Sequence, residues 1–334
     1  MGPDGPAGTI RCVTKTAPRA FSGSRLQWSD LPRHVRARIV DLAGAEVTSE
    51  TSATTGFSPG FASVLELGDG TRVFVKAVSP EQNPESPGLA RKEIVVAAAL
   101  PPGVCAPPLL WSDDDGAWVL LGFEAVDGVA PRLPWDPAEL RRVLGALTDL
   151  ADAGTPAPPG LPDLATDMAD VARGWERLAE DGSAVDRALE AVGRHGPWMH
   201  ENLGALARWA ADGPTAGAGD TLVHGDIRAD NVLLSPDQVW LIDWPHACSG
   251  GSRWWDLLAM LPSVAMQDGG DPETIFWGHP NAAGADRDAV RAVLAGVAGF
   301  FVHGAVQPPP PGLTNLRPFQ LAQGVEALDW LRRF

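Results

Sequence analysis

The residues best suited to chemistry in this 334-residue chain form a short polar run between two apolar segments. The run reads HGDIRADN over positions 224–231, and Asp243 follows it in the segment LIDW. Phosphoryl transfer needs a carboxylate beside the attacking hydroxyl and oxygen ligands for Mg²⁺ at the phosphates, with little covalent chemistry from the protein. Asp226 would accept the hydroxyl proton, while Asn231 and Asp243 would hold Mg²⁺, which prefers hard oxygen donors. The pattern therefore predicts transfer of the γ-phosphate of a nucleoside triphosphate to a hydroxyl.

Together the two segments resemble the aminoglycoside phosphotransferase and choline kinase family, which carries H-G-D-x-x-x-x-N where protein kinases carry H-R-D-x-x-x-x-N. The resemblance implies that Asp226 is the catalytic aspartate, that Asn231 and Asp243 bind Mg²⁺, and that ATP or GTP is the phosphate donor. Trp244-Pro245 stands where the D-F-G element of protein kinases has Phe-Gly. Gly225 replaces the arginine that reads a phosphorylated activation loop, so we expect activity without prior phosphorylation.

Three further residues in or near this run have functional and structural interpretations. His224 is expected to orient the loop through hydrogen bonds and to have no role in proton transfer. By the resemblance Arg228 would neutralise charge in the transition state, but an ion pair with Asp230 is an equal alternative. Asp256 resembles the family aspartate whose carboxylate accepts N–H bonds from the catalytic loop, and the alternative is an ordinary carboxylate on a helix.

The front part of the chain contains a second charged pair. The alternation of residues 73–78 predicts a strand that places Phe74 and Lys76 on one face. Glu93 lies on the predicted helix that follows, and the pair resembles the kinase lysine that contacts the α- and β-phosphates and is held by a helix glutamate. In protein kinases a small residue stands at the position of Phe74 and covers the adenine. The choice between ATP and GTP therefore stays open.

Two backbone segments complete the predicted nucleotide site. Residues 56–63 (GFSPGFAS) would form a turn between two strands, in which the N–H groups of Ser58 and Gly60 reach phosphate oxygens. The spacing of this turn is not G-x-G-x-x-G. By the resemblance, Glu124 and Val126 in the segment that connects the lobes would contact the edge of the base through backbone groups.

The expected elements divide the chain into a sheet-rich front and a helix-rich back. Residues 61–67 with 71–78, and 108–112 with 117–123, predict two hairpins around Gly-containing turns. Apolar periodicity and capping residues predict helices over 30–44, 86–100, 136–150, 167–180, 184–194, 201–211, 254–261, 286–302 and 316–331. Short strand signals return at 221–223, 232–234 and 239–242.

This order predicts an α+β, bilobal, protein-kinase-like fold. Residues 25–124 would form a small N-lobe, with a β-sheet and one helix, that binds the nucleotide. Residues 125–334 would form a larger, mainly helical C-lobe with the catalytic loop, the metal site and the acceptor pocket. Residues 1–24 lack periodicity and are expected to be a flexible tail.

Composition limits the classes of partner and the compartment. The net charge of -16 and the pI near 4.7 argue against nucleic acid or an anionic membrane as partner. Acidic residues also keep a protein soluble, so the net charge alone does not identify a substrate. The three cysteines are far apart and form no C-x-x-C, which favours a reducing cytoplasm. The apolar stretch 292–302 is shorter than the roughly 20 residues of a membrane helix, and the first 20 residues contain no signal-peptide core.

The acceptor is the least determined part of the prediction. Acidic and aromatic residues of the back half are candidates for binding a cationic or sugar-like hydroxyl substrate; they are Glu201, Trp254, Trp255, Asp268 and Trp277. For most of the 13 tryptophans, packing in the core or on the surface is the favoured alternative. A small-molecule phosphotransferase that acts on an antibiotic, a sugar or an amino alcohol is the favoured hypothesis. The alternatives are a kinase of peptide or protein hydroxyls and a nucleotide-binding pseudokinase that acts as an interaction module.

Overall fold

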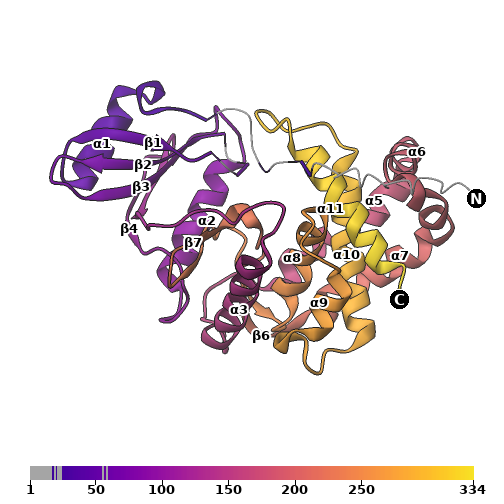
Figure 1. Ribbon diagram of the computed structural model, residues 1–334. Helices are drawn as coiled ribbons and strands as arrows, with labels where there is room; N and C mark the ends of the chain where they lie inside the picture. Colours follow the sequence, from indigo (N-terminus) through magenta and orange to yellow (C-terminus); the bar gives the residue numbers. More distant parts are fainter. Residues whose placement is uncertain (1–16, 19, 21–24, 55, 58) are drawn as a thin grey trace, which may run out of the picture.

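The computed structural model describes residues 17–18, 20, 25–54, 56–57 and 59–334, which form a smaller lobe with a sheet and a larger, mainly helical lobe. Figure 1 shows the small lobe at the indigo end of the colour scale, beside the orange and yellow helices of the large lobe. The predicted α+β bilobal fold is confirmed by this arrangement.

The described part of the small lobe contains a five-stranded antiparallel sheet in the order β1-β2-β3-β5-β4. Its strands are β1 (Val47–Ser52), β2 (Phe61–Leu67), β3 (Arg72–Val78), β4 (Leu109–Asp114) and β5 (Val119–Glu124). Both expected hairpins are therefore present. The expected strand before the Gly-containing turn is β1, which the sequence analysis did not place because its residues, VTSETS, carry no apolar alternation.

Two helices pack on this sheet. Leu120 and Leu121 of β5 are both fully buried, but Leu120 belongs to the cluster of α1 (Arg33–Ala43) and Leu121 to the cluster of α2 (Ser86–Ala99). Because successive strand residues point to opposite faces, the two helices pack against opposite faces of the sheet. Lys76 lies on the face of α2, which brings it to the helix that carries Glu93.

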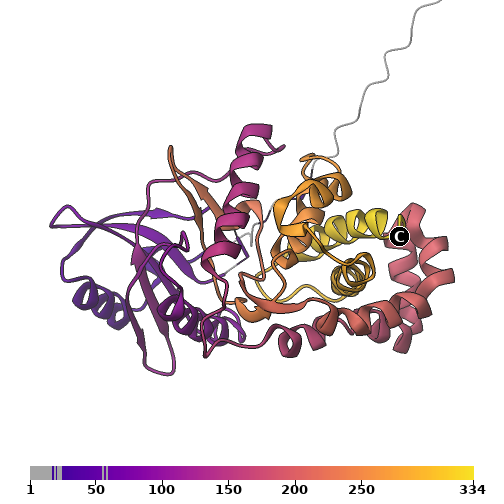
Figure 2. The same cartoon turned by 90° about the horizontal axis from the view of Figure 1, so that it is seen from below.

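The large lobe consists mostly of helices. They are α3 (Pro137–Ala153), α4 (Leu164–Val171), α5 (Gly174–Glu180), α6 (Gly182–Ala191), α7 (Gly196–Ala216), α8 (Trp255–Met266), α9 (Pro272–Gly278), α10 (Arg287–Ala305) and α11 (Leu316–Leu331). Two short strand pairs accompany them, β6 (Ala218–Val223) with β9 (Cys248–Gly251) and β7 (Val232–Leu234) with β8 (Val239–Leu241). Figure 2 shows these strands between the small lobe and the helices.

The helices differ from the expected ones at several points, and α7 in particular is longer than the expected helix 201–211. The expected helix 167–180 is two helices, α4 and α5, because Gly174 lies against the backbone of Gly299, where an added Cβ would be 2.3 Å from a backbone atom. This close approach allows α5 to pack on α10. The short helix α9 and strand β9 were not expected.

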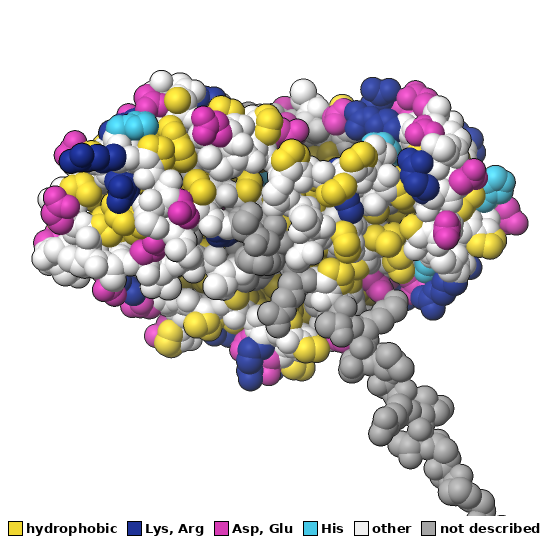
Figure 3. Space-filling model, turned by 90° about the horizontal axis from the view of Figure 1, so that it is seen from above, with side chains coloured by type: hydrophobic (Ala, Val, Ile, Leu, Met, Phe, Trp, Pro, Cys, Tyr) yellow, Lys and Arg dark blue, Asp and Glu magenta, His cyan; other side chains and the backbone are white. Residues whose placement is uncertain are grey.

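Helix α10 is the central helix of the large lobe and packs against α5, α7 and α11. By length and composition it could cross a membrane, yet 61% of its apolar window is buried inside the protein. Its apolar side chains are accounted for by contacts with the neighbouring helices. On the face seen in Figure 3, basic side chains are scattered among acidic and apolar ones and form no continuous basic area.

Candidate active site

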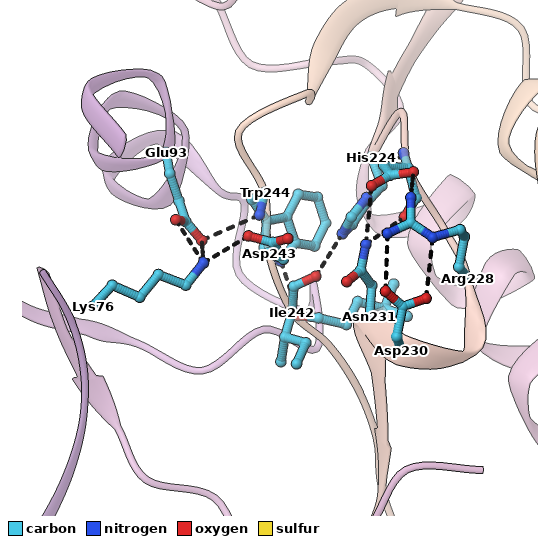
Figure 4. Close-up of polar contacts among 11 residues, drawn as sticks. Lys76, Glu93, His224, Arg228, Asp230, Asn231, Ile242, Asp243 and Trp244 are labelled. Atoms are coloured by element: carbon cyan, nitrogen blue, oxygen red, sulfur yellow. Dashed lines mark hydrogen bonds and ion pairs between the residues drawn. The ribbon is translucent and has the colours of Figure 1, made fainter. Parts of the chain in front are cut away.

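The loop between β6 and the short 3-10 helix η3 (Ala229–Asn231) carries the carboxylate of Asp226. Its two oxygens have different partners: Oδ1 forms an ion pair with Arg228, and Oδ2 accepts a hydrogen bond of 3.1 Å from Nδ2 of Asn231. The same amide nitrogen donates to the backbone carbonyl of Asp226 at 2.8 Å. Burial raises the pKa of Asp226, and the neighbouring Arg228 opposes the rise. Figure 4 labels Arg228 and Asn231, the two partners of this carboxylate.

His224 connects the loop to the strand that precedes Asp243. Its Nε2 donates to the carbonyl of Ile242 at 3.0 Å, and its Nδ1 accepts from the N–H of Asp226 at 3.3 Å. The ring also contacts Trp244, with 4.4 Å between ring centroids. Burial lowers the pKa of His224 to about 4, so the ring is neutral near pH 7. These contacts fit an orienting role for the histidine.

Asp256, in the first turn of α8, holds the start of the loop. Its carboxylate accepts the N–H of His224 at 2.7 Å and the N–H of Gly225 at 2.9 Å. Burial raises the pKa of Asp256 to about 6. Gly225 has φ 82°, and a Cβ there would lie 2.4 Å from the carbonyl oxygen of His246. The turn therefore requires glycine, and the aspartate fixes its N–H groups.

Lys76, Glu93 and Asp243 form a charged triad between the lobes, as Figure 4 shows. The ammonium of Lys76 lies 2.8 Å from both oxygens of Glu93 and 2.7 Å from Oδ1 of Asp243. Burial opposes ionisation of Asp243, but the ammonium outweighs it and lowers the pKa of this carboxyl. The N–H of Trp244 donates to Glu93 at 3.2 Å. Lys76 thus connects the sheet, helix α2 and the segment after β8.

Asn231 and Asp243 provide donors that fit Mg²⁺. With Nδ2 of Asn231 engaged by Asp226, its Oδ1 has no hydrogen bond to any described residue, and Asp243 uses only Oδ1 for Lys76. Asp243 has φ 68°, a left-handed conformation that is uncommon for a residue other than glycine. One amide and one carboxylate oxygen suit a cation that completes its shell with phosphate oxygens and water. The described residues contain no cluster of three or more His, Cys, Asp or Glu that would form a separate metal cage.

Arg228 lies between two aspartates. Besides Asp226 it binds Asp230, with Nε to Oδ1 at 3.0 Å and Nη2 to Oδ2 at 2.9 Å. The salt bridge with Asp230 is therefore present, and it does not replace a contact with the predicted catalytic carboxylate. Two residues that the sequence analysis missed, Phe57 and Phe319, also contact this guanidinium. No local pattern marks either of them.

The residues expected to contact the nucleotide through their backbone groups differ in their surroundings. Ser58 lies outside the described residues. Gly60 is buried against β3, where a Cβ would be 2.8 Å from the carbonyl oxygen of Ala77. The N–H of Glu124 donates to the carbonyl of Pro108 at 2.9 Å, so this N–H is not available for a base. Val126 is half-buried in the segment between the lobes.

The acceptor candidates differ in burial. Trp254 and Trp255 are 7% and 4% exposed and belong to the core, which agrees with the packing role that the sequence offered for the tryptophans. Trp277 packs edge-on against the buried Phe276, with 4.9 Å between ring centroids. Tryptophans that follow a catalytic segment can serve packing as well as binding, and the sequence does not separate the two. Glu201 and Asp268 are exposed.

A lobe with a five-stranded sheet, a mainly helical lobe and a lysine–aspartate–asparagine cluster between them define a kinase-like phosphotransferase. Comparison with protein families identifies the family of this phosphotransferase: the model of the phosphotransferase enzyme family matches residues 54–296. The chain belongs to this family, and the predicted resemblance is confirmed. A comparison with curated proteins finds no match.

Three solved structures illustrate this fold. An apo thermostable mutant of aminoglycoside phosphotransferase APH(4)-Ia has a TM-score of 0.57 and 17% identity, over 89% of this chain and 98% of that chain. Choline kinase LicA from Streptococcus pneumoniae has a TM-score of 0.56 and 14% identity, over 90% and 99%. Spectinomycin phosphotransferase APH(9)-Ia has a TM-score of 0.52 and 12% identity, over 89% and 98%. At these identities the likeness shows the fold.

Proposed function

We propose that this phosphotransferase moves the γ-phosphate of ATP or GTP to a hydroxyl of a small molecule in the cytoplasm. The observation that carries the proposal is the convergence of Lys76 and Asp243 with the loop of Asp226 and Asn231 between the lobes. These side chains come from both lobes and match the order and types that the reaction requires. Family membership supports the same class of reaction.

The groups divide the work of the transfer. Asp226 accepts the proton of the acceptor hydroxyl. The hydroxyl oxygen bonds to the γ-phosphorus, and the bond between the γ-phosphorus and the β,γ-bridging oxygen breaks. Lys76, held by Glu93, would contact the α- and β-phosphates. Mg²⁺ bound by Asn231 and Asp243 would neutralise charge on the phosphate oxygens. His224 and Asp256 hold the loop in place through the hydrogen bonds described above.

The solved relatives and the net charge support a small-molecule acceptor. One structure of the aminoglycoside phosphotransferase variant is a ternary complex with ADP and hygromycin B, and the spectinomycin phosphotransferase structure holds ADP and spectinomycin. Together with choline kinase, these proteins act on small molecules with hydroxyl groups. The net charge of -16 favours a cationic or sugar-like acceptor, including an antibiotic, over a nucleic acid or membrane.

The test is turnover of Mg-ATP and Mg-GTP with a panel of aminoglycosides, other antibiotics, amino alcohols, sugars and peptides. We expect at least one small molecule to gain a phosphoryl group, detected by mass spectrometry. The Asp226→Ala variant should lose this activity, whereas Asp237→Ala, at an exposed residue of the β7–β8 turn, should retain it. Transfer to peptides alone, or nucleotide binding with no transfer to any acceptor, would contradict the proposal.

A further inference from the structure

The turn between β1 and β2 is in contact with the last helix of the chain. Phe57 of this turn meets Phe319 of α11 edge-on, with 5.2 Å between ring centroids and 69° between the ring planes. An edge-to-face pair at this distance is a favourable aromatic arrangement. A second contact joins the same two segments: Gly312, at φ 75°, lies so close to Pro59 that a Cβ would be 3.1 Å from the Cβ of the proline. The turn thus rests on the chain segment that leads into α11.

The guanidinium of Arg228 lies beside both rings. Its Cζ is 5.8 Å from the centroid of Phe57 and 5.7 Å from the centroid of Phe319. Both distances are within the range of a cation–π interaction. The polar edge of the same guanidinium faces Asp226 and Asp230. Two carboxylates and two rings therefore restrain one side chain.

The two rings differ in burial. Phe319 is 1% exposed and Phe57 is half-buried. Arg228 itself has a side chain that is 14% exposed, so its charge is largely withdrawn from water. A guanidinium in this setting has few alternative conformations as long as both rings are present. Because Oδ1 of Asp226 is held by this arginine, the orientation of the carboxylate depends on it.

We propose that Phe57 and Phe319 are positioning residues that hold Arg228 against Asp226 and so fix the catalytic carboxylate. This inference rests on the proposed function for the role of Asp226. It also gives the C-terminal helix α11 a part in the active site, beyond its packing in the core. The turn over the nucleotide site and the catalytic loop then share one aromatic contact.

The test measures the restraint on Arg228 directly, by NMR of its Nε–H group in the full-length protein, with the signal assigned through Arg228→Lys. Phe57→Leu and Phe319→Leu remove a ring and keep an apolar side chain. We expect each to speed exchange of this proton with water by about tenfold and to reduce its ring-current shift, because one of the two rings is lost. Phe57→Tyr keeps the ring and should leave both quantities as in the wild type.

Phe276→Leu is the matched packing control, because Phe276 is fully buried in the large lobe and its ring contacts are with tryptophans. It should not change the Arg228 signal. If Phe319→Leu does not fold, the Phe57→Leu variant tests the inference alone. Phe57 is half-buried on a turn, so its replacement disturbs the core less. Wild-type exchange and shift in a folded Phe57→Leu variant would overturn the inference.

Kinetics then separate positioning from binding. With an acceptor from the panel, Phe57→Leu should lower kcat by about tenfold at an unchanged KM for Mg-ATP, and Phe57→Tyr should restore kcat. A lower kcat in the tyrosine variant as well would contradict the positioning role. Absence of any acceptor would refute the proposed function, while the NMR result would still decide whether the rings hold Arg228.

Discussion

At the scale of single residues, the charges of the site stabilise one another, Lys76 across three elements and Arg228 within its own loop. Lys76 of β3 is bound by Glu93 of α2 and by Asp243 after β8, and Arg228 is bound by two aspartates. Removing one member of a buried pair leaves the other uncompensated, which costs more than the pair contributes. Variants at these positions should therefore affect binding and stability together.

Glu93 offers the sharpest case, because its side chain is 4% exposed. Glu93→Gln keeps the shape and removes the charge, so Lys76 would be held by Asp243 alone. We expect the Kd of Mg-ATP to rise roughly tenfold or more and the Tm to fall, since breaking a buried pair costs about 3–5 kcal/mol. Calorimetry and thermal unfolding measure both. Glu85→Gln, at an exposed residue just before α2, is the control; equal Kd values for the two variants would argue against a role for Glu93 in holding the lysine.

His224 gives a pH-dependent prediction. Its pKa is about 4 in the folded protein and about 6.5 in the unfolded chain, so the unfolded state binds the proton more readily. The associated stability is present above pH 6.5 and is lost as the pH falls towards 4, by about 3 kcal/mol in total.

Denaturant unfolding of wild type and His224→Asn from pH 7 to pH 4 measures this loss as a difference. Asp256, whose pKa burial raises to about 6, acts in the opposite direction but is present in both proteins and cancels. The wild type should lose more stability than the variant over this range. His200→Asn, at an exposed histidine, should follow the wild type. A constant difference between wild type and His224→Asn would show that the ring does not titrate as described.

At the scale of elements, most of what local pattern determines was predictable. The alternation of residues 73–78 and the Gly-containing turns define the hairpins, and Asp136 before Pro137 marks the start of α3, where it accepts N–H bonds from the first turn. The run 224–231 with Asp243 likewise gave the core of the site, because those residue types follow from the chemistry. Phe57 and Phe319 could not be predicted, since their contact with Arg228 depends on how distant segments pack. The break between α4 and α5 has the same origin, in the approach of Gly174 to α10.

The catalytic loop itself makes an element-scale prediction at Gly225. Its φ of 82° disfavours an L-residue, and the carbonyl of His246 occupies the space of a Cβ. Gly225→Ala should therefore shift the loop and lower both stability, by more than about 1 kcal/mol, and kcat. Gly284→Ala is the control, because that glycine has a similar φ of 77° but nothing within 4 Å of an added Cβ. If both variants lost the same stability and kept full activity, close packing of the loop would be irrelevant to function.

At the scale of the whole molecule, the two lobes meet through the Lys76–Asp243 ion pair, the Trp244–Glu93 hydrogen bond and the aromatic contact of Phe57 with α11. In the described residues these contacts bring Lys76, Glu93 and Asp243 together. These contacts form although position 225 is a glycine, where protein kinases have the arginine that reads a phosphorylated activation loop.

We therefore expect the protein to be active as translated. Treatment with a broad-specificity phosphatase, followed by removal of the phosphatase, should leave kcat and KM unchanged. Intact-mass measurement before and after treatment verifies the phosphorylation state. Loss of turnover after dephosphorylation would show that a phosphorylated residue controls the site.

The most direct test of the central assignment compares nucleotide binding with phosphoryl transfer in Asp226→Asn and Asp243→Asn. Asp226→Asn should bind Mg-ATP as the wild type does and transfer phosphate about 10²–10⁴-fold more slowly, because the lost group acts on the acceptor hydroxyl. Asp243→Asn should lose the Mg²⁺-dependent part of ATP binding. Wild-type transfer rates in Asp226→Asn, or Mg²⁺-dependent binding preserved in Asp243→Asn, would contradict the account.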